Sequence, residues 1–272
     1  MPELEIAGKR VHFIETAGAP ETPPSGRLRP AVVLIHGAGG DHTVWGEQLS
    51  GLRGAIRLLI PDLSGHGRSA STDDASIPAH ARVIRELILR TGLIRPLVAG
   101  HSMGGGIALQ AALDDPGLVG GVLLIASGAR LAVAARVFEM IEQDPREAIR
   151  EIARTAYGPQ TPDEMVERGV ATLSRSSPAV LTQDFRACDA FDVRDRLGSL
   201  AVPLRILCGS ADRLMLPKFA EKLAASVPGA KLRIIAGAGH LLMIERPEEV
   251  NRELAGFVEE VAGAPAPDVV RP

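Results

Sequence analysis

Short runs of branched apolar residues alternate with longer amphipathic segments along this chain, and no other feature constrains its fold as strongly. Runs of this kind are typical of parallel strands that are covered on both faces. Helices between successive parallel strands form right-handed crossovers, which pack on both sides of one sheet. The sequence therefore predicts an α/β fold with a mainly parallel sheet, whose strands lie at 31–36, 57–62, 96–101, 119–126, 203–209 and 231–237.

The segments between the apolar runs show helical periodicity. In residues 77–91 the apolar side chains recur at the spacing of one helix face. Residues 103–113, 217–227 and 247–261 are predicted as further helices, and the last two open with a proline, which suits a first helical turn. Near the N-terminus two alternating runs flank Gly8, which predicts an antiparallel hairpin at one edge of the sheet.

Residues 128–198 interrupt the alternation. They contain no strand pattern but several helical segments, so we expect a separate helical unit, called the cap below. The core is then formed by residues 1–127 and 199–262. Residues 17–30 are predicted as a Pro/Gly-rich surface loop and residues 263–272 as a flexible tail.

Composition argues against several classes of function. The 272 residues are 46% hydrophobic and 23% charged, which suits a soluble globular protein with a sizeable core. The net charge of −3 and the 3% of aromatic residues give no support for nucleic-acid binding. No apolar stretch approaches the roughly 18 residues of a membrane span, and the N-terminus lacks a signal-peptide core. Cys188 and Cys208 match no metal-binding spacing and are predicted as buried thiols, so we expect a cytoplasmic protein without a metal.

A serine stands between a predicted strand and a predicted helix. Residues 98–106 read V-A-G-H-S-M-G-G-G, so Ser102 has glycines two positions before and two positions after it. Taken alone, such a serine could simply cap the helix. The G-x-S-x-G pattern on a strand–turn–helix is, however, typical of a nucleophile elbow, a turn too tight for side chains at the glycine positions. Ser102 is therefore the candidate nucleophile.

A serine nucleophile needs a histidine base and a carboxylate. After such an elbow the expected chain order is serine, acid, histidine. Asp212 follows the strand at 203–209, and His240 follows the strand at 231–237 in a glycine-rich loop. Both positions lie at carboxyl ends of parallel strands, where sites form, although each could also be an ordinary loop residue. Weaker candidates for the acid, which precede the serine, are Asp41, Asp62 and Asp73.

Two backbone N–H groups are needed to bind a developing oxyanion. Met103, which follows the nucleophile, is expected to supply one of them. The loop after the strand at 31–36 reads H-G-A-G-G, and we expect Ala38 to supply the other, with Gly39 as the alternative. A phosphate-binding role for this loop is disfavoured because the spacing G-x-x-x-x-G-K-[ST] does not occur.

These motifs together resemble the α/β-hydrolase-fold serine hydrolases. They follow the order of that family, and they read L-I-H-G-A-G-G (34–40), P-D-L-S-G-H-G-R-S (61–69), A-G-H-S-M-G-G (99–105), G-S-A-D (209–212) and G-A-G-H-L-L-M-I-E-R-P (237–247). The resemblance implies a mainly parallel eight-stranded sheet flanked by helices, with a helical cap inserted after the sixth strand. It also implies that no metal and no organic cofactor takes part.

The activity that the resemblance implies is hydrolysis of a carboxylic ester of a small to medium substrate, through an acyl-enzyme. Ser102, His240 and Asp212 would form the triad. Lactonases and C–C hydrolases of meta-cleavage products also resemble the chain, although the loop H-G-A-G-G-D-H departs from the form common in C–C hydrolases. A non-enzymatic small-molecule receptor on the same fold is the alternative from another class. A monomer and a homodimer both stay open.

Several residues are candidates for the substrate pocket. Leu241 follows the proposed base, and Trp45 either lines the pocket or anchors the helix after it. Apolar side chains of the cap are expected to form the acyl wall. The cap contains none of the proposed triad or oxyanion groups, so chemistry and substrate selection are expected to be separable. The cap candidates are Phe138, Met140, Met165 and Phe185.

Three other histidines are interpreted as structural. His36 and His66 are expected to hydrogen-bond the surrounding loops, because buried polar groups usually satisfy one another. Asp62 and Arg68 are expected to take part in the same turn-rich stretch. His101 points away from Ser102 if the strand alternates regularly, so packing is the better interpretation.

Overall fold

The computed structural model describes residues 2–17 and 30–263 of the chain. The loop expected at 17–30 and the tail expected at 263–272 lie almost entirely outside the described residues. Eight strands form one sheet in the order β1-β2-β4-β3-β5-β6-β7-β8. Their bounds are β1 Glu3–Ile6, β2 Lys9–Glu15, β3 Val32–Ile35, β4 Leu58–Pro61, β5 Leu97–His101, β6 Gly121–Ile125, β7 Leu204–Gly209 and β8 Lys231–Ile235.

Strand direction agrees with the sequence analysis. β1 pairs with β2, and β2 with β4, in antiparallel fashion, and every other pairing in the sheet is parallel. The hairpin β1–β2 turns at Ala7 and Gly8, whose φ values are 49° and 73°, as a tight turn between twisted strands requires. The predicted eight-stranded, mainly parallel sheet with an edge hairpin is therefore confirmed.

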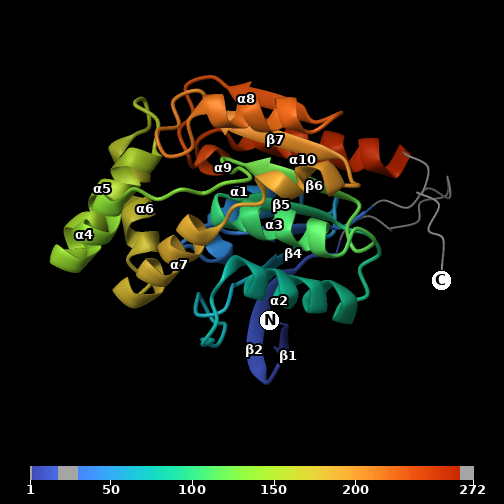
Figure 1. Cartoon of the computed structure of the whole chain (residues 1–272), viewed down its shortest axis with the longest axis horizontal. Helices are drawn as coiled ribbons and strands as arrows, with labels where there is room; N and C mark the ends of the chain where they lie inside the picture. The colour runs from blue at the N-terminus through green and yellow to red at the C-terminus, as the bar shows by residue number, and fades with distance from the viewer. Residues whose placement is uncertain (1, 18–29, 264–272) are drawn as a thin grey trace.

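Helices cover both faces of the sheet (Figure 1). One face carries α2 (Ile77–Arg90), α3 (Met103–Asp114) and α8 (Pro217–Ser226), and the other carries α1 (Gly46–Gly51), α9 (Leu242–Glu245) and α10 (Pro247–Gly263). Alternate residues of each central strand enter the two cores. In β3, for example, Val33 and Ile35 pack on the first face, and Val32 and Leu34 on the second.

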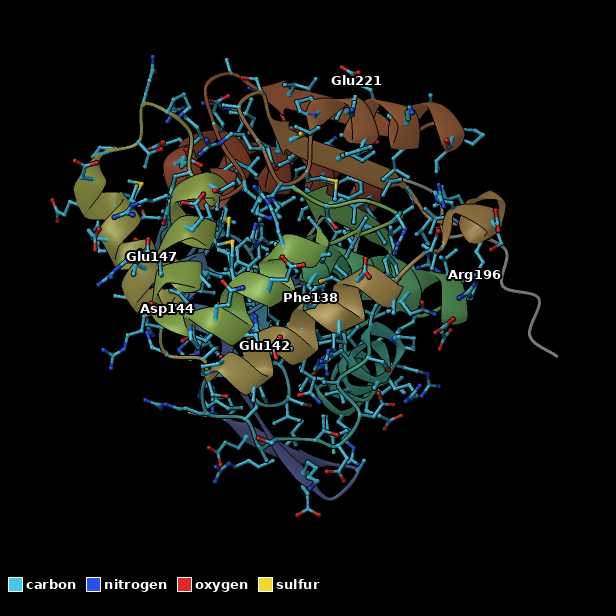
Figure 2. All side chains as sticks on the ribbon, turned by 60° about the vertical axis from the view of Figure 1, so that its left-hand side comes forward. Phe138, Glu142, Asp144, Glu147, Arg196 and Glu221 are labelled. Carbon is cyan, nitrogen blue, oxygen red and sulfur yellow. The ribbon has the colours of Figure 1, made fainter. Side chains whose placement is uncertain are left out.

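Four helices lie between β6 and β7, at one end of the molecule (Figure 1). They are α4 (Ala135–Gln143), α5 (Pro145–Ala156), α6 (Asp163–Leu173) and α7 (Pro178–Ala190), and they share a small apolar cluster around Ile149 and Leu181. Asp144 caps α5 by accepting backbone hydrogen bonds (Figure 2). The predicted insertion of helices after the sixth strand is thus present.

The C-terminal part of the insertion packs differently from the rest. Cys188, Phe191 and Val193 belong to the main core, together with Leu197 in the short 3-10 helix η2 (Arg194–Ser199). The division of the chain at residues 128 and 198 therefore stays a proposal, because this stretch contributes to both clusters. The helices α4 to α6 and the first half of α7 contribute instead to the small apolar cluster around Ile149 and Leu181.

Two further expectations concern cysteines and membranes. Cys188 and Cys208 are free and buried, as predicted. Burial raises the pKa of both thiols, so neither is a reactive thiolate near neutral pH. No helix within the described ranges combines the length and the apolar character that crossing a membrane requires.

Candidate active site

The turn between β5 and α3 holds Ser102 in a strained conformation. Its φ and ψ are 51° and −117°, and holding a residue other than glycine in such a region costs about 1–3 kcal/mol. The Ser102 N–H donates to the Ile125 carbonyl at 3.0 Å, and the Ser127 hydroxyl donates to the Ser102 carbonyl at 2.7 Å. β6 and the residues after it therefore fix the turn, and Ser102 lines the pocket described below.

Close backbone packing explains the glycines on either side of Ser102. A Cβ atom on Gly100 would overlap the backbone of Gly104, and one on Gly104 would overlap the carbonyls of Ile35 and His36. The overlapping atoms belong to the backbone. Backbone atoms in the middle of a sheet cannot move away from an added Cβ, whereas the end of a flexible side chain can. The reason that the sequence analysis gave for these glycines is confirmed.

We expect the substitution Gly104→Ala to lower the free energy of unfolding by about 1–3 kcal/mol, the usual cost of overpacking a filled core. Urea denaturation followed by circular dichroism measures this change. Gly198→Ala is the matched control, because no atom lies within 4 Å of the added Cβ there. Equal denaturation midpoints for the two variants would show that the elbow tolerates a side chain.

His240 and Asp212 form a hydrogen-bonded pair. His240 Nδ1 lies 2.9 Å from Asp212 Oδ2. The other carboxylate oxygen accepts the backbone N–H groups of Leu214 and Met215, at 2.9 and 2.8 Å. Asp212 is 2% exposed, so the backbone fixes its orientation inside the protein. A carboxylate held in this way selects the tautomer with hydrogen on Nδ1, which leaves His240 Nε2 as an acceptor.

Ser102 and His240 reach the same pocket from different loops. Within the described residues no hydrogen bond joins Ser102 Oγ to His240 Nε2. Contacts of this kind are often long in enzymes without substrate and shorten when substrate binds. The fold therefore brings all three predicted triad residues to one end of the sheet, with the acid–base contact already made.

His101 packs against the histidine of this pair. The two rings meet edge to face with their centroids 4.8 Å apart. Burial holds the pKa of His101 well below its usual range, so its ring is neutral. Its Nε2–H donates to the His240 carbonyl at 3.1 Å. The packing role is confirmed and the ring supports the loop that carries His240, but His101 also lines the pocket that contains Ser102.

The two expected oxyanion donors remain available. Within the described part of the chain, neither the Ala38 N–H nor the Met103 N–H has an acceptor. The Gly39 N–H, the alternative donor, is already bonded to the side chain of Asp184 at 2.8 Å. This bond disfavours Gly39 as an oxyanion donor and leaves Ala38 and Met103 as the pair that can serve Ser102.

Asp62, a weaker candidate for the acid, lies in a separate network. Its oxygens accept hydrogen bonds from the rings of His12 and His42 and from the backbone N–H groups of His42 and Arg68, at 2.8 to 3.0 Å. Burial raises the pKa of Asp62, but these bonds outweigh burial and hold its pKa below the usual range. The expected association of Asp62 with Arg68 is confirmed through the Arg68 backbone.

The three side chains His12, His42 and Asp62 are also close enough to hold a metal ion. Each ring uses its Nδ1 in a hydrogen bond of 2.8 Å to Asp62. Each Nδ1 therefore carries a hydrogen that it donates to Asp62, so neither Nδ1 has a lone pair free for a metal, and the arrangement is that of a structural network. We assign no metal to this cluster.

His36 has the structural role expected for it. Its Nδ1 lies 2.8 Å from the Gly37 carbonyl, and its Nε2 accepts the Leu63 N–H at 3.0 Å. Burial lowers the pKa of His36 to about 4, so the ring is neutral and can accept at Nε2. His36 thus joins the loop after β3 to the loop after β4.

A pocket of about 500 Å³ lies between the sheet and the cap helices, over Ser102 and His240. Its walls are mostly apolar and come from both parts of the chain. Leu241, Met165 and Phe185 line it, as expected. The other apolar side chains that line it include Val133, Val137, Ile152, Leu173, Leu214, Met215 and Ile244.

Three of the expected pocket residues do not line this pocket. Trp45 is fully buried in the second core, so it anchors the helices around it. Met140 packs against the apolar cluster inside the cap. Phe138 lies half-buried on α4 (Figure 2) and is not among the residues that line the pocket. For Trp45 the structure agrees with the second of the two expected roles, whereas Phe138 and Met140 are corrections: periodicity shows that a helix has an apolar face, but not what covers that face.

One polar residue at the site was not predicted from the sequence. Asp184 lies on α7, is 1% exposed and contacts the loop that carries Ala38. A signal was present in the sequence, because Asp184 falls on the same helix face as the buried Leu181 and Cys188. A carboxylate on an apolar helix face is rarely buried without a partner, so it indicates a specific contact.

Comparisons with known proteins agree with this architecture. The pimeloyl-[acyl-carrier protein] methyl ester esterase of Vibrio vulnificus is 28% identical over 243 residues, which cover 84% of this chain and 94% of that protein. The structure of a thermophilic esterase matches with a TM-score of 0.83 and 26% identity, over 96% of this chain and 97% of the other. An enzyme that degrades N-acyl homoserine lactones matches with a TM-score of 0.84 and 26% identity, over 94% and 100%.

The model of one family covers most of the sequence. It matches residues 32–253, from the first strand of the parallel sheet to the last helix. The matched region includes the elbow, the loops after β3, β7 and β8, and the inserted helices. The chain belongs to the alpha/beta hydrolase family, and it is a hydrolase.

Proposed function

We propose that the chain is a serine hydrolase that cleaves carboxylic esters of small to medium size through an acyl-enzyme. The observation that carries the proposal is the hydrogen bond between His240 and the buried Asp212, with His240 lining the same pocket as Ser102. This set of groups can activate a serine without a metal or an organic cofactor. The esterase names of several relatives support the same class.

Acylation follows from the positions of the groups. Ser102 Oγ attacks the ester carbonyl carbon while His240 Nε2 takes the hydroxyl proton. The carbonyl oxygen becomes an oxyanion, to which the N–H groups of Ala38 and Met103 donate hydrogen bonds. When the intermediate collapses, the bond to the alcohol oxygen breaks, and His240 returns the proton to that alcohol. Asp212 stabilises the charged imidazole between these transfers.

Deacylation uses the same groups, with water in the place of the ester alcohol. Water attacks the acyl carbon of the ester formed with Ser102, and His240 accepts a proton from that water. The oxyanion forms again beside Ala38 and Met103, and it collapses as Ser102 takes back its proton. The products are a carboxylic acid and the free enzyme, so the two half-reactions balance with one water consumed.

The mostly apolar wall of the pocket predicts that it accepts apolar acyl chains, although Arg136, Arg168 and Arg213 also line it. A cavity of about 500 Å³ is large enough for a medium-sized organic substrate. We expect turnover of p-nitrophenyl esters from acetate to octanoate. N-acyl homoserine lactones belong in the same panel, because an enzyme with a similar structure degrades them. No turnover of any ester or lactone, combined with ligand-dependent thermal stabilisation, would favour a receptor instead.

Shortening a side chain that lines the acyl pocket should change which esters the enzyme prefers. We expect Met165→Ala to change the ratio of kcat/KM between octanoate and acetate esters about ten-fold, the effect of one or two methylenes in an apolar pocket. Met165 lines the pocket, whereas Phe138 lies in the same cap without lining it. Phe138→Ala is therefore the matched control, expected to keep the wild-type ratio. Equal ratios for both variants and the wild type would show that Met165 does not contact the acyl chain.

A further inference from the structure

The cap holds both backbone polar groups of Gly39, in the loop that carries Ala38. The Gly39 N–H donates to Asp184 Oδ2 at 2.8 Å, and the Gly39 carbonyl accepts the hydroxyl of Ser176 at 3.0 Å. Asp184 lies on α7, and Ser176 lies just before that helix. The Ala38 N–H lies one peptide unit before the Gly39 N–H. The two hydrogen bonds of Gly39 therefore restrain the direction in which the Ala38 N–H points.

Apolar side chains of the cap close over the same glycine. The φ of Gly39 is 66°, and a Cβ there would lie 2.9 Å from Leu181 and overlap Leu173. Both leucines belong to the cap helices. Gly39 is thus enclosed by cap side chains as well as hydrogen-bonded to them. The neighbouring Asp41 adds a further link, since it accepts a hydrogen bond from Arg175 of the cap at 3.0 Å.

Asp184 is itself fixed to the core. The oxygen that accepts the Gly39 N–H also lies 2.8 Å from His66 Nε2, and the His66 Nδ1 lies 3.1 Å from the Ser64 carbonyl. Asp184 is 1% exposed, and its other oxygen has no partner in the described part of the chain. Burying a carboxylate with half of its acceptor capacity unused is costly. One oxygen of Asp184 therefore joins the Gly39 N–H to the His66 ring, which pairs with the buried carboxylate.

We infer that Asp184 is a positioning residue for the oxyanion hole, which it acts on through the Gly39 N–H. By holding that N–H, Asp184 keeps Gly39 out of the hole and turns the preceding peptide so that the Ala38 N–H stays free. The cap therefore takes part in the chemistry as well as in selecting the substrate. This proposal departs from the expectation that the two are separable, although the triad and the oxyanion donors still come from the core.

This role rests on the proposed function, and it predicts a loss in kcat rather than in KM. The oxyanion exists in the transition state and not in the bound ester. A misdirected donor therefore weakens the stabilisation of the transition state and leaves the binding of the ester unchanged. Losing a whole oxyanion donor costs roughly 100- to 1,000-fold in kcat. Because Asp184 acts on the donor through one peptide unit, we expect Asp184→Ala to lower kcat by about 10- to 100-fold, with KM changed by less than about three-fold.

The test uses p-nitrophenyl acetate, whose short acyl group needs little of the cap wall. Asp184→Asn keeps a carbonyl oxygen that can accept the Gly39 N–H, so it should retain at least about a third of the wild-type kcat. Asp189→Ala is the matched control, because Asp189 lies on the same helix and bonds the Val133 N–H rather than the oxyanion loop. Its kcat should match that of the wild type. The inhibition constant of phenylboronic acid, which forms a tetrahedral adduct with serine, should rise with the loss in kcat.

Melting temperatures separate this role from a merely structural one. A folded Asp184→Ala with wild-type kcat would overturn the inference, and so would a loss confined to KM or an equal loss in Asp189→Ala. If Asp184→Ala does not fold, Ser176→Ala replaces it, because that variant frees only the Gly39 carbonyl. Ser176→Ala should lower kcat about three- to ten-fold, because it displaces the Ala38 N–H less than Asp184→Ala does. A wild-type kcat in this variant would also overturn the inference. A wild-type protein that hydrolyses no ester would instead refute the proposed function.

Discussion

Ser102→Ala should lower kcat for p-nitrophenyl acetate by about 10⁴- to 10⁶-fold, the range seen when the nucleophile of such a triad is removed. The physical reason is that the variant lacks the hydroxyl that the strained turn brings to the pocket lined by His240. The fold should survive, because alanine is smaller than serine and the side chain of Ser102 donates no hydrogen bond to the core in the described residues. Initial rates with the purified variant, together with its melting temperature, measure both effects.

The melting temperature of this variant should stay close to that of the wild type. Alanine at the same φ of 51° keeps most of the backbone strain, so any gain should be small. Contaminating hydrolases are controlled for by preparing the wild type and the variant in parallel. A folded Ser102→Ala that retains more than about a hundredth of the wild-type rate would remove Ser102 from the role of nucleophile.

Asp212→Asn should lower kcat by about 10³- to 10⁴-fold, because an amide beside His240 favours the wrong tautomer and cannot stabilise the imidazolium. Asp62→Asn should behave in the opposite way. That carboxylate contacts His12 and His42 but not His240, so its loss should lower the melting temperature and leave kcat within about ten-fold of the wild type. Rates and melting temperatures of both variants provide the comparison.

The pH of this comparison matters for Asp62. Hydrogen bonds hold its folded-state pKa below the ordinary value of 3.8, so its stabilising contribution is complete above that value and is lost as the pH falls. Measurements near pH 7.5 therefore report its full contribution. A severe catalytic loss in Asp62→Asn combined with a mild one in Asp212→Asn would show that the wrong carboxylate has been assigned to the triad.

The fold could be predicted because its determinants are local. Each parallel strand is an apolar run buried on both faces, and each crossover helix has an apolar stripe, so periods of two and 3.6 residues are visible directly. Gly100 and Gly104 indicated the elbow in the sequence. At both positions a Cβ would overlap neighbouring backbone atoms, so glycine is required there. The order of motifs along the chain then located Asp212 and His240, because carboxyl ends of parallel strands meet at one edge.

The cap was predicted less well, because its contacts join residues far apart in sequence. Phe138 and Phe185 are both aromatic residues on amphipathic cap helices, yet only Phe185 reaches the pocket. Which of them does so depends on how α4 and α7 are rotated against the sheet, and no local pattern gives that rotation. Asp184 is bonded to Gly39 across 145 positions of sequence, so its partner could not be identified before the fold was known.

Covalent labelling tests the central claim, that Ser102 is the nucleophile, most directly. The wild-type protein is treated with a fluorophosphonate, which forms a stable bond with an activated serine, and is then digested and analysed by mass spectrometry. We expect stoichiometric labelling confined to the peptide that contains Ser102, loss of ester hydrolysis in proportion to labelling, and no label in Ser102→Ala. A label on another residue, or full hydrolysis by protein labelled at Ser102, would contradict the account.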